Sequence, residues 1–346
     1  SRPAKLPVCP NPKTAFNRDF VNQPSFQAPA AEHPFAPYVR ILGKGKTGSR
    51  SLDRQEAHDA FGMILREEVD PLQLGAFLML LRVKEETGEE LAGFVDACRA
   101  NMLPPPVDLG AQLDWSSYAG KKHQHPWYLL TMLLLAGAGY RVFAHGGDGH
   151  TAGRLYTEQA MAELGMPVAS DWSQVGEQLD AQNLSYLPLR AFCPRLHDIM
   201  QLRPLLGLRS PVNTLVRMLN PLRCDASIQS IFHPAYGDLH RDADRILSQP
   251  RSLVFKGDSG EIEIKPQADT RLLLLDNAVE QELTLPRTLA NKAAAVNQPS
   301  TEPVRALWVG STTDNYGLDA VLATTAAALV LLEPEWNIGQ CRAHSE

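Results

Sequence analysis

The feature that most constrains the fold of this chain is an alternation of short β-rich runs with helical stretches, which starts near residue 109. Such alternation is typical of units in which a helix returns the chain to form the next parallel strand. It predicts an α/β domain with a central, largely parallel sheet. The strand-like runs cover residues 140–144, 185–192, 227–232, 253–256 and 272–275.

Three closely spaced helices are predicted before this region. Ser51 can cap the first, Asp70-Pro71 can begin the second, and the capping box from Thr87 to Glu90 can begin the third. The second helix is apolar nearly all round over residues 72–81, so it is expected to be buried. Pro104-Pro105-Pro106 then ends a small, mostly helical domain.

Residues 1–37 are predicted to form an irregular arm, because eight prolines block a regular helix or a central strand. The sequence leaves open a flexible extension and an arm that packs on a partner subunit.

The composition bears on the cellular compartment in which the protein is expected. The 346 residues carry a net charge of −6, and the five cysteines lie far apart with no Cys-x-x-Cys spacing. This spacing argues against a zinc site and a disulfide scaffold, and it fits the reduced cytoplasm. The longest apolar stretch, residues 129–138, is about half the length that crosses a bilayer, so no membrane partner is expected.

A glycine-rich segment, Gly43-Lys44-Gly45-Lys46-Thr47-Gly48, has the spacing of a dinucleotide-binding loop. That chemistry needs a strand before the loop, and here the strand would cover residues 38–42 at most, while the next helix opens a helical bundle. Nor does the Lys-Ser/Thr of a Walker A loop follow. What remains is a basic loop, either solvated or in contact with backbone phosphates. Its cations are Arg40, Lys44, Lys46, Arg50 and Arg54.

Two further basic clusters follow. Lys121 and Lys122 lie just before a helix that starts near Pro126, where helix-terminal amides favour an anion. Beside them, Tyr118 and Trp127 could stack on bases or belong to the core. The third cluster can bind phosphate in bidentate fashion or cover apolar surface. It consists of Arg190, Arg195, Arg203, Arg209, Arg217 and Arg223, against the single Asp198.

Several segments resemble the class II nucleoside phosphorylase and phosphoribosyltransferase family, also called glycosyltransferase family 3, which includes anthranilate phosphoribosyltransferase. The matching segments are Asp70-Pro71-Leu72-Gln73-Leu74, residues 77–87, His145-Gly146, Ala162-Glu163-Leu164-Gly165 and Leu206-Gly207-Leu208-Arg209-Ser210. The resemblance runs from about residue 42 to residue 332. It implies a helical domain over 38–108 with about 195–220, and an α/β domain over 109–194 with about 221–346.

The resemblance also implies a pocket between these domains, where Gly120, His123, His145, Gly146 and Arg203 would meet a small ligand. However, the family's diphosphate loop, Gly-Thr-Gly-Gly-Asp, is here Ala119-Gly120-Lys121-Lys122-His123. The family's magnesium-binding Asp-Glu pair aligns near Gly260-Glu261, and Asp258 or Glu263 could replace the missing carboxylate. No cofactor is therefore expected. The weaker alternative is Mg²⁺ with phosphoribosyl diphosphate, held through Glu261 and Glu263.

These departures resemble one branch of the family, the YbiB-type proteins. The branch is indicated by Leu52-Asp53-Arg54, Ser117-Tyr118-Ala119-Gly120, Ala191-Phe192-Cys193-Pro194 and residues 256–261. It implies a homodimer that binds DNA or RNA without sequence preference through basic grooves. The alternatives are a glycosyl or phosphoribosyl transferase of unknown acceptor and a sensor of a phosphorylated small ligand. The expected phosphate-binding residues are Lys44, Lys46, Arg50, Arg54, Lys121, Lys122, Arg203, Arg209 and Arg217.

Overall fold

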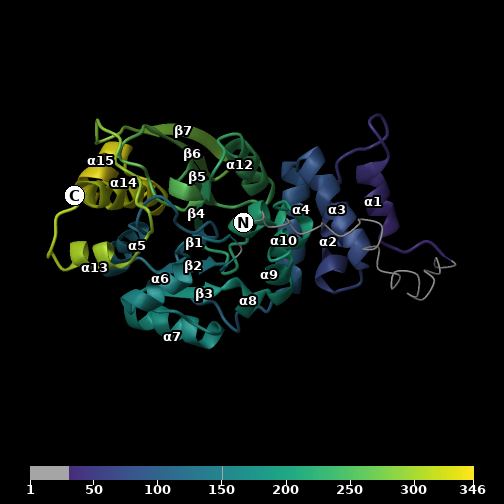
Figure 1. Ribbon diagram of the computed structural model, residues 1–346, viewed down its shortest axis with the longest axis horizontal. Coiled ribbons are helices and arrows are strands. Elements are labelled where there is room, and N and C mark those ends of the chain that lie inside the picture. Colours follow the sequence, from purple (N-terminus) through teal and green to yellow (C-terminus); the bar gives the residue numbers. More distant parts are fainter. Residues whose placement is uncertain (1–30, 150) are drawn as a thin grey trace, which may run out of the picture.

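The computed structural model describes residues 31–149 and 151–346, so most of the expected N-terminal arm lies outside the described residues. Figure 1 shows helices α1–α4 gathered at one end of the molecule and α13–α15 at the opposite end, with the sheet between them. The predicted combination of a helical domain with an α/β domain is thereby confirmed.

The helical end is built from four helices whose starts are mostly capped. Asp53, Asp70 and Thr87 each form a capping box at the N-termini of α2, α3 and α4. Ser51 is not the cap of α2; its hydroxyl instead accepts a hydrogen bond from Lys84 Nζ at 2.8 Å. The helices are α1 (Ala36–Gly43), α2 (Arg54–Leu65), α3 (Pro71–Lys84) and α4 (Gly88–Asn101).

Helix α3 is buried on one face only, which corrects the expectation that its whole interior is buried. Leu74, Phe77 and Leu81 enter the core, whereas Leu72 stays 72% exposed and Val83 84% exposed. A sequence that is apolar all round does not reveal which face meets a partner element.

A later segment returns to the helical end. It comprises α9 (Pro194–Met200), α10 (Arg203–Leu206) and α11 (Val212–Leu215). Leu196 and Leu215 share one core with Phe77 and Phe94 of the helical end. The chain therefore crosses between the two parts several times, and this places side chains from both parts at their junction.

The sheet has seven strands in the order β3-β2-β1-β4-β5-β6-β7. The first five in this order are parallel, and β6 and β7 join as an antiparallel edge. The strands are β1 (Leu113–Ser117), β2 (Val142–Gly146), β3 (Leu184–Pro188), β4 (Ala226–Ile231), β5 (Arg251–Lys256), β6 (Thr270–Asp276) and β7 (Val279–Leu285).

Helices cover both faces of the sheet. Trp115 and Ile228 pack with residues of α5, α6 and α14 on one face, whereas Phe143 and Leu187 pack with residues of α7 on the other. The remaining helices are α5 (Tyr128–Gly137), α6 (Thr157–Leu164), α7 (Trp172–Gln182), α8 (Leu189–Phe192), α12 (Tyr236–Ile246), α13 (Glu302–Trp308), α14 (Asn315–Leu332) and α15 (Ile338–Ser345).

One helix among the described residues, α14, has the length and apolar composition of a membrane span. Two thirds of it is buried inside the protein, because it packs on α5 and on the sheet. This burial is typical of a core helix.

The sequence analysis did not predict strands β1 and β7, and it assigned the residues of helix α1 to a strand. β1 contains Asp114, Ser116 and Ser117, whose polarity hides a fully buried strand, and β7 is mostly exposed and has no apolar run. Residues 38–42 belong to helix α1 and not to a strand. This removes the remaining structural basis for a dinucleotide loop at residues 43–48.

Candidate anion-binding cleft

Three loops meet beside the carboxyl ends of neighbouring parallel strands. They are residues 118–123 after β1, residues 232–235 after β4 and residues 257–263 after β5. Ligands of open α/β sheets bind at this edge, so these loops and the helical end that faces them form the candidate site.

The loop after β1 is already closed around a carboxylate of the protein itself. Glu261 Oε1 accepts hydrogen bonds from the backbone N–H groups of Ala119 and Gly120 at 2.7 and 2.6 Å. The Ser117 hydroxyl donates to Glu261 Oε2 at 2.5 Å. Gly120 has φ +70°, and a Cβ there would lie 3.0 Å from the Arg154 side chain. The glycine thus lets the loop turn its amides toward an internal anion.

Lys121 is fully buried and forms ion pairs with two carboxylates. Its Nζ donates to Glu263 at 2.5 Å and also to Asp258. Burial opposes the charge on Lys121, but Glu263 and Asp258 outweigh burial and raise its pKa. Lys121 cannot contact a phosphate from this buried position, so the expectation that it binds phosphate together with Lys122 is wrong for Lys121. Lys122 is exposed, as expected.

The pKa values of the two carboxylates that pair with Lys121 shift in opposite directions. Burial raises the pKa of Glu263 to about 7, against the charge of Lys121. Burial acts in the same direction on Asp258, but the charges of Lys121 and Lys265 outweigh it and lower the pKa of Asp258. Lys265 is 3.4 Å from Asp258, and this second cation explains the difference.

These residues do not fit a magnesium ion with a diphosphate. The carboxylate oxygens of Glu261 already accept from Ser117, Ala119 and Gly120, and Glu263 accepts from Lys121 and from the Tyr128 N–H at 3.0 Å. A lysine ammonium occupies the space between Asp258 and Glu263 where a cation would sit. No group of three metal-binding side chains occurs in the described part of the chain.

In front of this closed loop lie five arginines, which we call the arginine cleft. They come from α3, the turn before α6, α10, and residues 209–217. A cavity of about 130 Å³ is lined by Arg82, Arg209 and Arg217 together with Phe232 and His233. Arg154 joins the same region through hydrogen bonds to the carbonyls of Ala119, Gly120 and Ser259. The five members are Arg82, Arg154, Arg203, Arg209 and Arg217.

The arginine cleft has an excess of positive charge: beside its arginines the cavity is lined by one carboxylate, Glu86. Within residues 31–149 and 151–346, none of its five arginines forms an ion pair with a carboxylate. Burial, followed by the charges of Arg154 and Arg203, lowers the pKa of Arg209. Burial also lowers the pKa of Arg217 to about 10; Glu261 acts against this, and Arg209 adds to it. Such mutual repulsion favours an anion among them.

The cleft arginines are held by neutral groups. Arg217 donates to the carbonyls of Ser230 and Gly260 at 2.5 and 2.7 Å, Arg203 to the Thr151 hydroxyl at 2.7 Å, and Arg82 to the Tyr236 hydroxyl at 3.2 Å. Neutral acceptors position a guanidinium without cancelling its charge, so each can still attract a phosphate.

The basic loop predicted at residues 40–54 lies elsewhere. Arg54 forms an ion pair with Asp96 and donates to the carbonyl of Ile246 at the end of α12, whereas Arg82 contacts Tyr236 at its start. Ten residues of helix separate these points by about 15 Å. Lys44 and Lys46 are exposed, but Arg50 is bound to Glu56 at 2.6 Å.

The third predicted cluster divides into three groups. Arg203, Arg209 and Arg217 enter the arginine cleft. Arg190 pairs with Glu158 at 2.6 Å, and Arg195 lies 3.6 Å from Glu67. Arg223 reaches a different cavity, described below. Arg82 and Arg154 were missed because no local pattern separates a cleft arginine from a surface arginine.

The residues expected to line a small-ligand pocket do not meet in one cavity. His145 is buried, with Nδ1 2.6 Å from the Tyr118 hydroxyl and Nε2 3.1 Å from Asp114. Gly146 is buried against Ser117, whereas His123 is exposed. Tyr118 and Trp127 are buried, so the interpretation of both as core residues is confirmed.

The same architecture occurs in solved anthranilate phosphoribosyltransferases. The Thermus thermophilus enzyme superposes with a TM-score of 0.75, at 22% identity, over 89% of this chain and 93% of that chain. The Saccharomyces cerevisiae enzyme in complex with PRPP and Mg gives a TM-score of 0.74, at 18% identity, over 91% and 93%. These likenesses define the fold.

Family matches identify the chain more closely. The helical bundle domain of the glycosyl transferase family matches residues 37–102, and its a/b domain matches residues 129–343. The chain belongs to this glycosyl transferase family. It is 29% identical to the uncharacterized protein YbiB of Escherichia coli over 69% of this chain and 75% of YbiB. It is also 29% identical to the anthranilate phosphoribosyltransferase of Methylocella silvestris over 68% and 67%.

Proposed function

We propose that the chain binds single-stranded DNA or RNA without sequence preference, as a homodimer, through the arginine cleft. The observation that carries the proposal is a cavity lined by Arg82, Arg209 and Arg217, with Arg154 and Arg203 near enough to Arg209 to lower its pKa. None of the five arginines forms an ion pair with a carboxylate in the described chain. A phosphate backbone supplies the missing negative charge, and arginine binds it in bidentate geometry.

An aromatic side chain beside the arginines favours a single strand over a duplex. Phe232 follows β4, lines the same cavity, and is 48% exposed. The ring of His233 lies edge-on to it at 4.9 Å. Exposed aromatics next to cations are the usual means of stacking unpaired bases while phosphates bind alongside. Phe232 thus takes the role that the sequence had suggested for Tyr118 and Trp127.

Salt dependence tests this proposal directly. A labelled single strand of mixed sequence is titrated with the protein at several salt concentrations, and fluorescence anisotropy gives the affinity. We expect log affinity to fall linearly with log salt, with a slope on the order of −3, since each contacted phosphate of a single strand contributes about −0.7. A matched duplex should bind more weakly. Absence of binding at low salt would contradict the proposal.

The homodimer rests on an apolar stripe along α3. Leu72, Ala76, Met79 and Val83 follow one another at helical spacing, and Leu72, Ala76 and Val83 are exposed. A continuous apolar stripe on a surface helix is typical of a helix-packing interface. Two-fold association would place two arginine clefts on one particle, which lengthens the track available to a strand.

Charges placed on this stripe should separate the subunits. The double variant Leu72→Glu/Val83→Glu is expected to run as a monomer in sedimentation velocity at a concentration where the unmodified chain is dimeric. Val279→Glu, at a residue of similar exposure on β7, should leave the dimer intact. A dimer that survives both charges on α3 would move the interface elsewhere.

A further inference from the structure

We propose that a second cavity, at the other ends of the parallel strands, binds a small molecule that carries a phosphate or carboxylate group. The cavity has a volume of about 830 Å³. Its lining includes Gln112 before β1, Asp225 before β4 and Arg251 at the start of β5, so it lies at the amino ends of the parallel strands. The arginine cleft lies at their carboxyl ends, and the two sites are therefore distinct.

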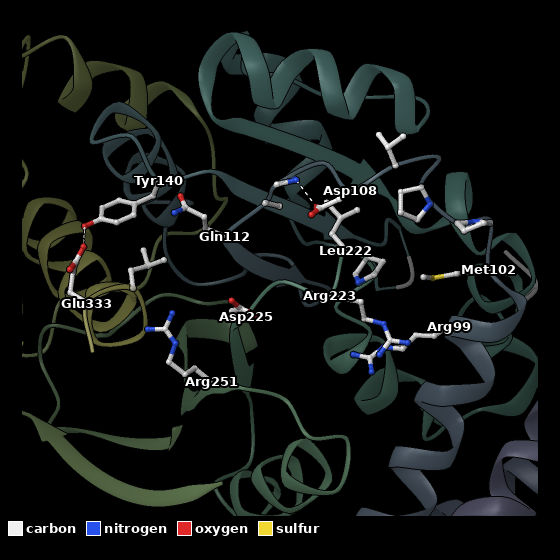
Figure 2. A pocket seen from close by; sticks show the side chains of 17 residues that line it. Arg99, Met102, Asp108, Gln112, Tyr140, Leu222, Arg223, Asp225, Arg251 and Glu333 are labelled. Atoms are coloured by element: carbon white, nitrogen blue, oxygen red, sulfur yellow. Dashed lines mark hydrogen bonds between the residues drawn. The ribbon is translucent and has the colours of Figure 1, made fainter. Parts of the chain in front are cut away.

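Two chain crossings between the helical end and the α/β domain form one wall of this cavity. Arg99 and Met102 come from the end of α4, and Leu222 and Arg223 come from the segment that leads back into β4 (Figure 2). Side chains from both parts of the protein thus converge on one space of a size usual for small-molecule sites, about 300–1,000 Å³.

Arg99 and Arg223 form the anion-binding end of the cavity. Figure 2 shows their guanidinium groups next to each other. Arg99 Nε donates to the carbonyl of Leu219 at 2.8 Å, and within the described residues neither arginine has a carboxylate partner. Burial, followed by the charge of Arg223, lowers the pKa of Arg99 to about 10. An oxyanion between them would replace this repulsion with charge-assisted hydrogen bonds.

The rest of the lining indicates what the anion is attached to. Met102, Val107 and Leu222 supply apolar surface beside the two arginines. Farther along, Gln112 and Asp225 offer polar groups, and Tyr140 is fixed by a 2.5 Å hydrogen bond to Glu333. At that end the two carboxylates of Asp225 and Glu333 outnumber the single cation Arg251, and this disfavours a second negative group there. The ligand class is therefore a mono-anionic head on a partly apolar body with hydroxyl or amino groups.

Arg223 is the better of the two arginines for a variant that removes positive charge from the cavity. Its backbone has φ 55°, a left-handed conformation that asparagine adopts more readily than arginine. Arg223→Asn therefore removes the guanidinium without adding backbone strain. Arg287→Asn is the matched control, because Arg287 is exposed and lies outside both cavities.

The test measures binding of inorganic phosphate and of acetate by thermal shift and calorimetry, at ionic strength matched with chloride. It is carried out in the Arg82→Gln/Arg209→Gln protein, so that the arginine cleft contributes little. We expect saturable binding of at least one of the two anions, and the tighter one identifies the head group. Arg223→Asn should weaken the binding of that anion at least tenfold, whereas Arg287→Asn should weaken it less than twofold.

Arg223→Lys gives a second, independent readout, because it keeps the charge but loses the bidentate geometry. Its affinity is expected to lie between that of the protein with Arg223 intact and that of the Arg223→Asn variant. The proposal would be overturned if the protein with Arg223 intact and the Arg223→Asn variant bound the anion with equal affinity. It would also be overturned if phosphate and acetate stabilised the protein no more than chloride does. Since the readout depends on Arg223, which lies outside the arginine cleft, it stands or falls separately from nucleic-acid binding.

Discussion

Replacing Lys121 by methionine is expected to lower the free energy of unfolding by about 3–5 kcal/mol, the usual effect of removing one partner from a buried ion pair. The lysine is fully buried between Asp258 and Glu263. Methionine is unbranched like lysine and only one heavy atom shorter, so packing changes little. The loss arises because Glu263 is left buried without a cation and Asp258 keeps only Lys265, so Glu263 must take up a proton or draw in water.

Urea unfolding of the variant and the unmodified chain measures this difference. Lys122→Met is the matched control, because the neighbouring lysine is exposed, and it should change stability by less than about 0.5 kcal/mol. The double variant Lys121→Met/Glu263→Gln should recover part of the loss, since it removes one of the uncompensated charges. Equal effects of Lys121→Met and Lys122→Met would contradict the buried ion pairs.

The loop after β1 keeps its shape through contacts within the protein. Glu261 satisfies the backbone amides of Ala119 and Gly120, and Lys121 satisfies Asp258 and Glu263. Each of these buried polar groups has a partner within the protein, so the loop needs no ligand to be stable. In the proposed function, external anions are therefore bound by the arginine cleft and not by this loop.

Much of the fold was predictable because its signals are local. The runs at residues 227–232 and 253–256 became β4 and β5 with small shifts in their ends, and the capping residues Asp70 and Thr87 begin α3 and α4. Strand propensity and helix caps depend on neighbouring residues, so a single sequence contains them. β1 was not predicted because its buried polar residues Asp114 and Ser117 find their partners on distant segments.

The site was less predictable because it depends on tertiary partners. Lys121 and Lys122 are adjacent in sequence, yet one is buried in ion pairs and the other is exposed. Only the return of residues 257–263 beside the loop distinguishes them. Arg82 belongs to the helical end, and no spacing in the sequence links it to Arg209. The family resemblance pointed to the loop after β1, but charge pairing decides which of its side chains are available to a ligand.

The double variant Arg82→Gln/Arg209→Gln is expected to lower affinity for a single strand about a hundredfold, since a hydrogen bond to a charged group contributes about 1.5–3 kcal/mol. The salt slope should become shallower by about 1.4, because two phosphate contacts are lost. Neither side chain has a carboxylate partner among the described residues, so the fold should be preserved. Anisotropy titrations at several salt concentrations give both quantities.

Two controls distinguish phosphate contacts in the arginine cleft from an effect of the protein's net charge. Arg66→Gln/Arg287→Gln removes the same charge from exposed positions outside the cleft and should change affinity less than about threefold through the long-range field alone. Phe232→Ala removes stacking but no charge, so it should cost roughly tenfold in affinity and leave the salt slope unchanged. If both arginine pairs weakened binding equally, the net charge of the protein would account for binding and the arginine cleft would not.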